Sequence, residues 1–285
     1  MTPDQYCQEK TAKSGSSFYY SFLFLSEQQR QAITALYAFC REVDDIVDGD
    51  LEDSVAQAKL AWWREEIARV YQHQATHPIG HALTTALTHY QLKQQYFLDI
   101  ITGMEMDLTQ FSYPDFPALS TYCHHVASVV GLLSVEIFGY QNEHTLRYAE
   151  QLGLALQLTN IIRDVREDAE RGRIYLPQDE LRHHNVDVDS ILALQQTPEL
   201  VSLLTAQAER AQHHYEQAFS LLPDCDRYTQ RTGIIMANIY QATLAEIAQD
   251  GFKVMEHRVS LTPLRKLWIA WRTARQQKRW QAKAA

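Results

Sequence analysis

The stretch Ala35-Leu-Tyr-Ala-Phe-Cys-Arg-Glu-Val-Asp-Asp-Ile-Val-Asp48 decides how the chain folds and what it can bind. It belongs to residues 28–49, where apolar side chains recur every three or four positions, as in an amphipathic helix that ends near Gly49. At about 100° per residue, apolar residues flank one narrow polar face, so we expect its carboxylates to line a cavity wall. That face carries Tyr37, Arg41, Asp44 and Asp48, with Asp45 at its edge.

A second acidic ladder follows in the stretch QLTNIIRDVRED, residues 157–168. Like charges one turn apart repel each other, and more strongly in a cavity, so we expect cations between the two ladders. Mg²⁺ takes oxygen ligands and usually binds through a few carboxylates plus substrate phosphates. The ladders together therefore predict a magnesium site that helps a diphosphate leave an allylic carbon. The second ladder consists of Asn160, Asp164 and Asp168, with Gln157 one turn earlier and apolar residues on both sides.

The ladders allow two other interpretations. A single acidic pair at this spacing is usually a solvated helix face, but two pairs, each set among apolar residues, favour a metal site. A di-iron bundle would need two Glu-x-x-His motifs. The one match, Glu180 to His183, lies in a polar stretch, which argues against this class.

The rest of the chain predicts an all-α fold. Only 10 glycines and 8 prolines occur in 285 residues, too few for a many-stranded sandwich, barrel or propeller. Prolines interrupt residues 111–117, and residues 170–190 read as a polar loop with room for one short helix. We therefore expect a single-domain helical bundle over residues 1–263, followed by a basic segment, residues 264–285. Helical periodicity continues through residues 55–71, 79–90, 94–108, 121–140, 144–168, 198–221 and 228–256.

Charge and cysteine usage limit the classes of partner. Residues 257–285 hold eight Lys and Arg and no acid, so residues 1–256 carry a net charge of −17. An acidic body argues against nucleic-acid binding, which needs a cationic surface. Four dispersed cysteines without a CxxC pair indicate a reducing compartment. No signal-peptide core opens the chain, and the longest apolar stretch, residues 126–135, is too short to span a bilayer, so we expect a cytoplasmic protein.

The basic segment allows two interpretations. Tryptophan beside a dense cationic face is typical of a helix that lies on an anionic membrane, here the inner face of the plasma membrane. The alternative is a terminal helix packed on the acidic body, whose charge it complements. The residues concerned are Leu264, Leu267, Trp268, Trp271 and Trp280, together with six Lys and Arg between positions 265 and 279.

These motifs resemble the squalene/phytoene synthase family, the head-to-head branch of the class I isoprenoid synthases. The two ladders match its two aspartate-rich motifs. The similarity also includes SGSSFYYSF at 14–22, GMEMDL at 103–108, YCHHVASVVGLLS at 122–134 and RGRIYLP at 171–177. The N-terminal stretch is most similar to the branch of the family that makes presqualene diphosphate in bacterial hopanoid synthesis.

The resemblance implies a bundle of the class I isoprenoid synthase type, with a central apolar cavity and both acidic motifs at its mouth. It assigns the metal ligands to Asp44, Asp48, Asn160, Asp164 and Asp168, with Asp45 as a further catalytic carboxylate. Two or three Mg²⁺ ions would bind together with substrate. The residues it places against diphosphate or substrate are Ser16, Ser17, Tyr37, Arg41, Gln157, Arg163, Tyr240 and Arg258.

The implied reaction joins two molecules of farnesyl diphosphate, with release of diphosphate and loss of a proton, to give presqualene diphosphate. His124 or His125 could accept that proton, as could the released diphosphate, although a hydrogen-bonded histidine with no role in the chemistry is an equal alternative. NADPH is not expected. A sibling synthase making squalene, dehydrosqualene or phytoene stays open, as does a non-catalytic isoprenoid- or diphosphate-binding protein. Downstream pathway enzymes are conceivable partners.

Overall fold

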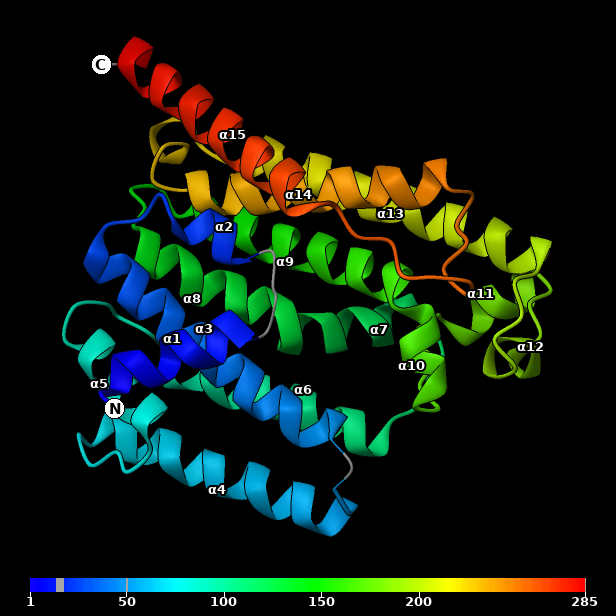
Figure 1. Cartoon of the computed structure of the whole chain (residues 1–285), viewed down its shortest axis with the longest axis horizontal. Coiled ribbons are helices and arrows are strands. Elements are labelled where there is room, and N and C mark those ends of the chain that lie inside the picture. Colours follow the sequence, from blue (N-terminus) through cyan, green and yellow to red (C-terminus); the bar gives the residue numbers. More distant parts are fainter. Residues whose placement is uncertain (14–17, 50, 285) are drawn as a thin grey trace.

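The computed structural model describes residues 1–13, 18–49 and 51–284 (Figure 1). Over these residues the regular backbone is helical, apart from one isolated bridge between Ser112 and Ile174, which confirms the predicted all-α fold. The helices are α1 (Pro3–Lys13), α2 (Phe18–Phe22), α3 (Glu27–Asp48), α4 (Asp53–Tyr71), α5 (Pro78–Leu87), α6 (Gln94–Thr109), α7 (Phe116–Cys123), η1 (His124–Ser128), α8 (Val129–Phe138), α9 (His144–Arg163), α10 (Val165–Glu170), α11 (Gln178–His183), α12 (Val188–Leu192), α13 (Pro198–Leu221), η2 (Asp224–Asp226), α14 (Arg231–Gln249) and α15 (Pro263–Ala284).

Helix α3, which carries the first ladder, begins at a capping box. The Ser26 side chain accepts a hydrogen bond from the backbone N–H of Gln29, and the Gln29 side chain bonds back to the backbone N–H of Ser26. The amide group of Gln29 also donates to the carbonyl oxygens of Ile137 and Phe138, at 3.2 and 3.1 Å. The start of α3 is thereby tied to the end of α8.

Two hydrophobic cores fill the bundle, and both contact the same helix run. The N-terminal core comprises buried residues of α1, α3, α4, α5, α6 and α8, around Phe39 and Phe97. The C-terminal core comprises buried residues of α7, α9, α13, α14 and α15, around Tyr148 and Tyr215. Val126 packs against both cores, so the run from α7 to α8 lies between them.

That central run differs from the predicted helix over residues 121–140. It extends from Phe116 to Phe138 as α7, the π-helical turn η1 and α8, and by length and composition it could cross a membrane. The expectation that no apolar stretch is long enough to span a bilayer is therefore wrong. The run is long because Pro117 lies in the first turn of α7, where a missing N–H is tolerated, rather than ending a helix. It packs against α6 and α9 in the middle of the bundle, as a core helix does (Figure 1).

Two glycines let this run approach α9 closely. A Cβ at Gly153 of α9 would lie 2.7 Å from Cα of Ser128, and a Cβ at Gly131 of α8 would lie 2.6 Å from the carbonyl oxygen of Ala149. Real side chains do not tolerate such distances, so both backbones need glycine here. Helix α9, which carries much of the second ladder, is held in direct backbone contact with the central run.

The predicted helix over residues 144–168 is interrupted at Asp164, which lies between α9 and α10. The four-residue repeat survives, because the N–H of Asp164 bonds the carbonyl of Asn160 and the N–H of Asp168 bonds that of Asp164, at 2.8 and 2.9 Å. The sequence does not predict helices α1 and α2. Helix α15 packs along α14, and the division into residues 1–263 and 264–285 stays a prediction.

Candidate active site

The first ladder is held by arginines at the end of α3. Arg41 donates to Asp44 and to Asp45, both at 2.6 Å, and Arg173 donates to Asp48 at 2.8 Å. Asp45 is exposed and also pairs with Lys10. The carboxylates of Asp44 and Asp48 are only partly exposed, in contrast to an ordinary solvated helix face.

The second ladder meets its own cations. Asp164 accepts from Nε of Arg163 at 2.7 Å and from Nε of Arg258 at 2.8 Å. These guanidinium groups outweigh the effect of burial and hold the pKa of Asp164 below its ordinary value. Arg258 comes from the segment between α14 and α15, so residues almost a hundred positions apart meet at this carboxylate.

Two other carboxylates have raised pKa values, and one of the two shifts comes partly from the opposite ladder. Burial raises the pKa of Asp44 to about 7, and the charges of Asp48 and Asp107 add to the shift against the opposing effect of Arg41. Burial also raises the pKa of Asp168 to about 8, with further contributions from Asp164 and from Asp107 and Asp48 of other helices. Asp48 of the first ladder therefore disfavours charge on Asp168 of the second, as the sequence predicts for two rows that need a cation between them.

The oxygen atoms of the site fit the chemistry of a hard divalent cation. Oδ1 of Asn160 is buried without a hydrogen-bond partner, while its amide nitrogen donates to Oε1 of Gln157 at 3.2 Å. An unpartnered buried oxygen is costly unless something binds it, and Mg²⁺ prefers oxygen ligands. Within the described ranges no three His, Cys, Asp or Glu side chains are already grouped as a metal cage, and Asp44, Asp48 and Asp164 pair with arginines.

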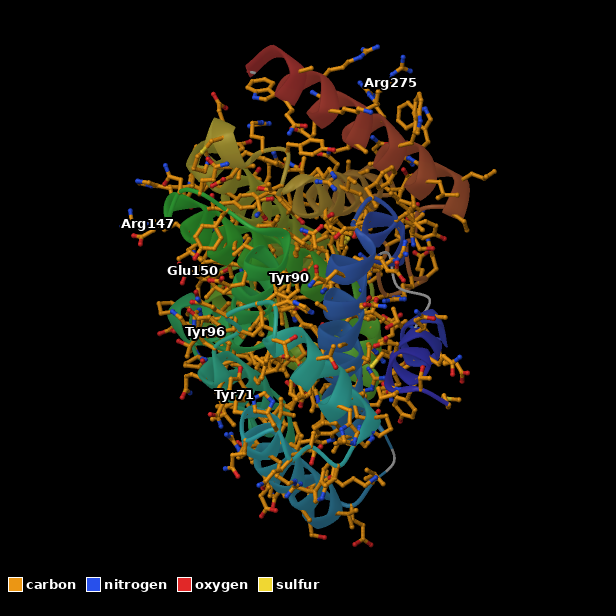
Figure 2. The ribbon with its side chains drawn as sticks, turned by 90° about the vertical axis from the view of Figure 1, so that its left-hand side faces the viewer. Tyr71, Tyr90, Tyr96, Arg147, Glu150 and Arg275 are labelled. Atoms are coloured by element: carbon orange, nitrogen blue, oxygen red, sulfur yellow. The ribbon has the colours of Figure 1, made fainter. Side chains whose placement is uncertain are left out.

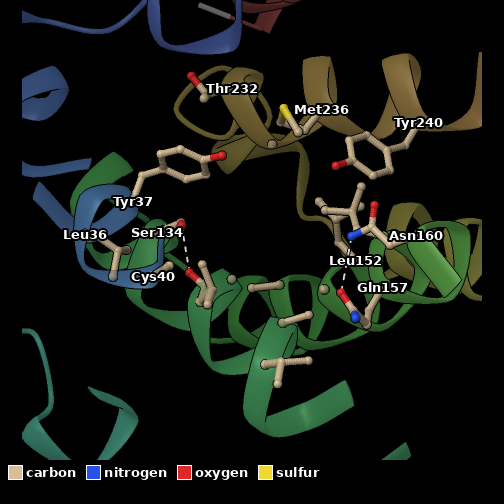
Figure 3. A pocket seen from close by; sticks show the side chains of 18 of the residues that line it. Leu36, Tyr37, Cys40, Ser134, Leu152, Gln157, Asn160, Thr232, Met236 and Tyr240 are labelled. Atoms are coloured by element: carbon tan, nitrogen blue, oxygen red, sulfur yellow. Dashed lines mark hydrogen bonds between the residues drawn. The ribbon is translucent and has the colours of Figure 1, made fainter. Parts of the chain in front are cut away.

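A cavity of about 410 Å³ opens beside the ladders and extends between the two cores. Figure 3 shows the side chains of Tyr37 and Tyr240 entering it from α3 and α14, with Gln157 and Asn160 on α9. Its deeper wall is apolar and includes Leu36, Val126 and Leu152. Of the predicted site residues, the cavity is lined by Tyr37, Arg41, Asp44, Gln157, Asn160, Arg163, Tyr240 and Arg258.

The other predicted site residues do not line this cavity. Asp48 and Asp164 have charge interactions with the lining residues Asp44 and Arg163. Asp168 interacts with residues outside the lining, among them Asp164 and Asp48, and Asp45 is exposed and pairs with Lys10. Ser16 and Ser17 lie outside the described residues. His124 and His125 belong to η1, and neither ring lines the cavity. Burial lowers the pKa of His125, and its Nδ1 is buried without a hydrogen-bond partner. The role of His124 or His125 as proton acceptor stays a prediction.

Sequence reasoning missed several cations and hydroxyls of the site. Lys266 of α15 lines the cavity, although the sequence places it in the separate basic segment. Arg173, almost fully buried, pairs with Asp48 from a stretch predicted to be a polar loop. Asp107 of the GMEMDL stretch is buried and accepts hydrogen bonds from the hydroxyls of Tyr122 and Tyr175, at 3.0 and 2.6 Å.

The fold and site define a class: an all-α bundle with an apolar cavity whose wall includes one oxygen-bearing side chain from each ladder, Asp44 and Asn160. Residues 11–265 match the family described as squalene/phytoene synthase, and the chain belongs to this family. It is a prenyltransferase of that family.

Similar proteins cover nearly the whole chain. A presqualene diphosphate synthase of Sinorhizobium fredii is 36% identical over 94% of this chain and 96% of the relative. A phytoene synthase of Mycobacterium bovis is also 36% identical, over 91% of this chain and 86% of the relative. The crystal structure of a dehydrosqualene synthase in complex with ligand superposes with a TM-score of 0.86, at 26% identity, covering 97% and 96% of the two chains.

Proposed function

We propose that the protein joins two molecules of farnesyl diphosphate head to head, in a Mg²⁺-dependent reaction that yields presqualene diphosphate and releases diphosphate. The observation that carries this proposal is one apolar cavity whose wall includes an oxygen-bearing residue of each ladder, Asp44 and Asn160, together with three arginines. Membership of the squalene/phytoene synthase family and the similarity to a presqualene diphosphate synthase support it.

The ladders and the arginines have complementary tasks in this proposal. The proposed metal ligands are Asp44, Asp48, Asn160, Asp164 and Asp168. When bound there, Mg²⁺ would neutralise the charge that develops on the leaving diphosphate. Arg41, Arg163 and Arg258 already lie at the cavity rim against the carboxylates. They can move their hydrogen bonds from carboxylate to diphosphate oxygens, and guanidinium groups suit both partners.

The cavity's task is to position two prenyl chains and to keep water from a carbocation. Its apolar wall excludes water from the reacting carbons, and holding two reactants in register lowers the barrier by several kcal/mol or more. Tyr37 and Gln157 extend into the cavity near its polar rim, where they can orient the chain that attacks (Figure 3).

The reaction product distinguishes the proposed enzyme from the related synthases of the same family. The equal identity to a phytoene synthase makes condensation of the longer geranylgeranyl diphosphate the second candidate. We propose that the enzyme stops at presqualene diphosphate without NADPH. We also propose that it works in the cytoplasm, in peripheral contact with the inner face of the plasma membrane.

Mass analysis of products tests the proposal. The full chain is incubated with farnesyl diphosphate or geranylgeranyl diphosphate and Mg²⁺, with and without NADPH. Presqualene diphosphate from farnesyl diphosphate supports it, whereas squalene with NADPH, or a preference for geranylgeranyl diphosphate, contradicts it. Asn160→Ala should lower kcat/KM about 100-fold, because it removes the unpartnered oxygen. Asn142→Ala, outside the cavity, is the matched control and should leave turnover unchanged.

A further inference from the structure

One face of α15 is strongly apolar and turned to solvent. Leu264 is 79% exposed, Trp268 53%, Trp271 52% and Leu267 41%. Their spacing of three and four residues places them on the same side of the helix. The opposite side is buried against the body: Ile269, Ala270, Thr273 and Gln277 are at most 9% exposed, and Asn238 of α14 donates to the hydroxyl of Thr273 at 2.8 Å.

Cations continue this face toward the C-terminus. At 100° per residue, Arg272, Arg275, Lys278 and Arg279 fall within the same sector as the exposed apolar residues. In the part of the chain that the structure describes, none of these four pairs with a carboxylate, and the one ion pair of α15 joins Arg265 to Glu246. Figure 2 shows the side chain of Arg275 pointing away from the body.

These unpaired charges favour one of the two interpretations of the basic segment. If the cations served to complement the acidic body, they would lie against its carboxylates. Instead the guanidinium of Arg272 lies over the ring of Trp268, at 5.1 Å, and that of Arg275 over Trp271, at 5.2 Å. The helix presents its cations and its tryptophans together, outward. Trp280, by contrast, contacts Arg227 of the body and does not belong to this face.

We propose that the outward face of α15, residues Leu264, Leu267, Trp268, Trp271, Arg272, Arg275, Lys278 and Arg279, docks the enzyme on an anionic lipid bilayer. Tryptophan rings suit the headgroup region, and each Lys or Arg near an anionic surface adds attraction. A second copy of the chain is a poorer occupant, because two such faces would bring eight cations together.

The position of the cavity gives this docking a purpose. The cavity wall includes Val259, Ser260 and Leu261, which lead into α15, and Lys266 in its first turn. The cavity therefore reaches the segment that anchors the docking face. A prenylated product that is almost insoluble in water could pass from there into lipid. That purpose rests on the proposed reaction, whereas the docking itself does not.

Vesicle sedimentation without substrate tests the docking. The full chain should bind vesicles of phosphatidylcholine with 30% phosphatidylglycerol, more weakly at high salt, and should not bind pure phosphatidylcholine. The triple variant R272E/R275E/R279E should lose about 100-fold in vesicle affinity or more. Trp268→Ala should also weaken binding. Circular dichroism checks that each variant is folded, and turnover of farnesyl diphosphate without vesicles tests the proposed function separately.

Matched controls separate the effect of this face from the effect of changing the net charge or an exposed tryptophan elsewhere. R30E/R147E/R182E reverses three exposed arginines elsewhere, and Trp62→Ala removes an exposed tryptophan of α4. We expect the tryptophan control to bind vesicles like the wild type, and the triple control to retain most of its affinity. The proposal is wrong if the wild type fails to bind anionic vesicles, or if R272E/R275E/R279E binds as well as R30E/R147E/R182E. It is also wrong if the wild type is a lipid-free dimer that Trp268→Ala separates.

Discussion

Asp164 and Asp168 are identical side chains one helical turn apart, yet the protein shifts their pKa values in opposite directions. Two arginines beside Asp164 hold its pKa low, whereas burial and neighbouring carboxylates raise the pKa of Asp168 to about 8. The site thus combines a carboxylate paired with arginine and a carboxylate that favours a proton when no metal is bound. A divalent cation would displace that proton.

Magnesium binding should therefore release protons near neutral pH. Because the pKa values of Asp44 and Asp168 are raised to about 7 and about 8, Mg²⁺ affinity should increase as the pH rises from 6 to 9. Calorimetry at pH 7 in two buffers of different ionisation enthalpy measures the protons released. Asp168→Asn should release fewer, and Asp224→Asn, on the exposed surface, should match the wild type. Equal proton release by Asp168→Asn and wild type would contradict the assignment.

The same shifts make a prediction for the metal-free protein. Between the ordinary aspartate pKa and about pH 8, the folded chain holds more protons at these two groups than the unfolded chain does. These two groups should therefore make the free energy of unfolding fall as the pH rises through this window. Urea denaturation at several pH values, with and without Mg²⁺, measures this. Added Mg²⁺ should offset this loss of stability. The pKa shifts would be contradicted if the contribution of Asp44 and Asp168 to the free energy of unfolding of the metal-free protein rose with pH.

Helix α4 is fixed to the start of α5 through one carboxylate. The fully buried side chain of Glu66 accepts hydrogen bonds from the backbone N–H groups of Thr76 and His77, from the Thr76 hydroxyl and from Arg69, at 2.7 to 2.8 Å. Burial alone would raise the pKa of Glu66, but these donors outweigh it and lower the pKa. Glu66 therefore stabilises the fold at neutral pH, and its contribution is lost as the pH falls below the ordinary glutamate range.

Glu66→Gln should lower the free energy of unfolding by about 3 kcal/mol at pH 7. The amide loses the charge-assisted bond to Arg69 and turns a donor toward backbone donors. Urea denaturation followed by circular dichroism measures the change. Glu65→Gln is the control, because its carboxylate is largely exposed and lies 3.5 Å from the same Arg69. If both variants lose the same stability, the buried network is not what holds α4 to α5.

The segment that carries Arg258 is anchored by α10, the helix that carries the last residue of the second ladder. Arg166 of α10 donates to the carbonyl oxygens of Met255 and Glu256, at 2.9 and 3.2 Å, two or three residues before Arg258. Gln196 bonds the same segment at Phe252 and Met255. The position of Arg258 at the cavity rim therefore depends on contacts outside the cavity.

Arg166→Ala should raise the KM for farnesyl diphosphate about tenfold, with a smaller change in kcat. In this variant Arg258 is still present, but it is no longer held in position at the cavity. Steady-state kinetics separate the two constants. Arg166→Lys should recover part of the effect, since a lysine can reach one carbonyl oxygen. Arg182→Ala, on the exposed side of α11, serves as control. An unchanged KM in Arg166→Ala would mean that the segment holds its position without this contact.

At the scale of the whole molecule, the sequence predicts the helices and the acidic ladders better than it predicts which distant residues pair with the ladders. Periodicity and the four-residue repeat reveal α3 and α9 because they are local. The pairs between Arg173 and Asp48, and between Arg258 and Asp164, join residues 125 and 94 positions apart, which no local pattern shows. The same reason explains why the sequence assigns Lys266 to the tail and not to the cavity.

The cavity lies between two cores, so a ligand that fills it should stabilise the whole bundle. A farnesyl diphosphate analogue with sulfur in place of the bridging oxygen resists ionisation and can bind without reacting. At about 100 times its Kd with Mg²⁺, it should raise the Tm by about 5 °C or more. The dimethylallyl analogue carries the same diphosphate on a short chain, so it reaches the ladders without spanning the apolar wall and should raise the Tm less. Scanning calorimetry of both, with and without Mg²⁺, separates the contributions of diphosphate, metal and chain. Equal shifts from the two analogues would show that the prenyl chain does not enter the cavity between the cores.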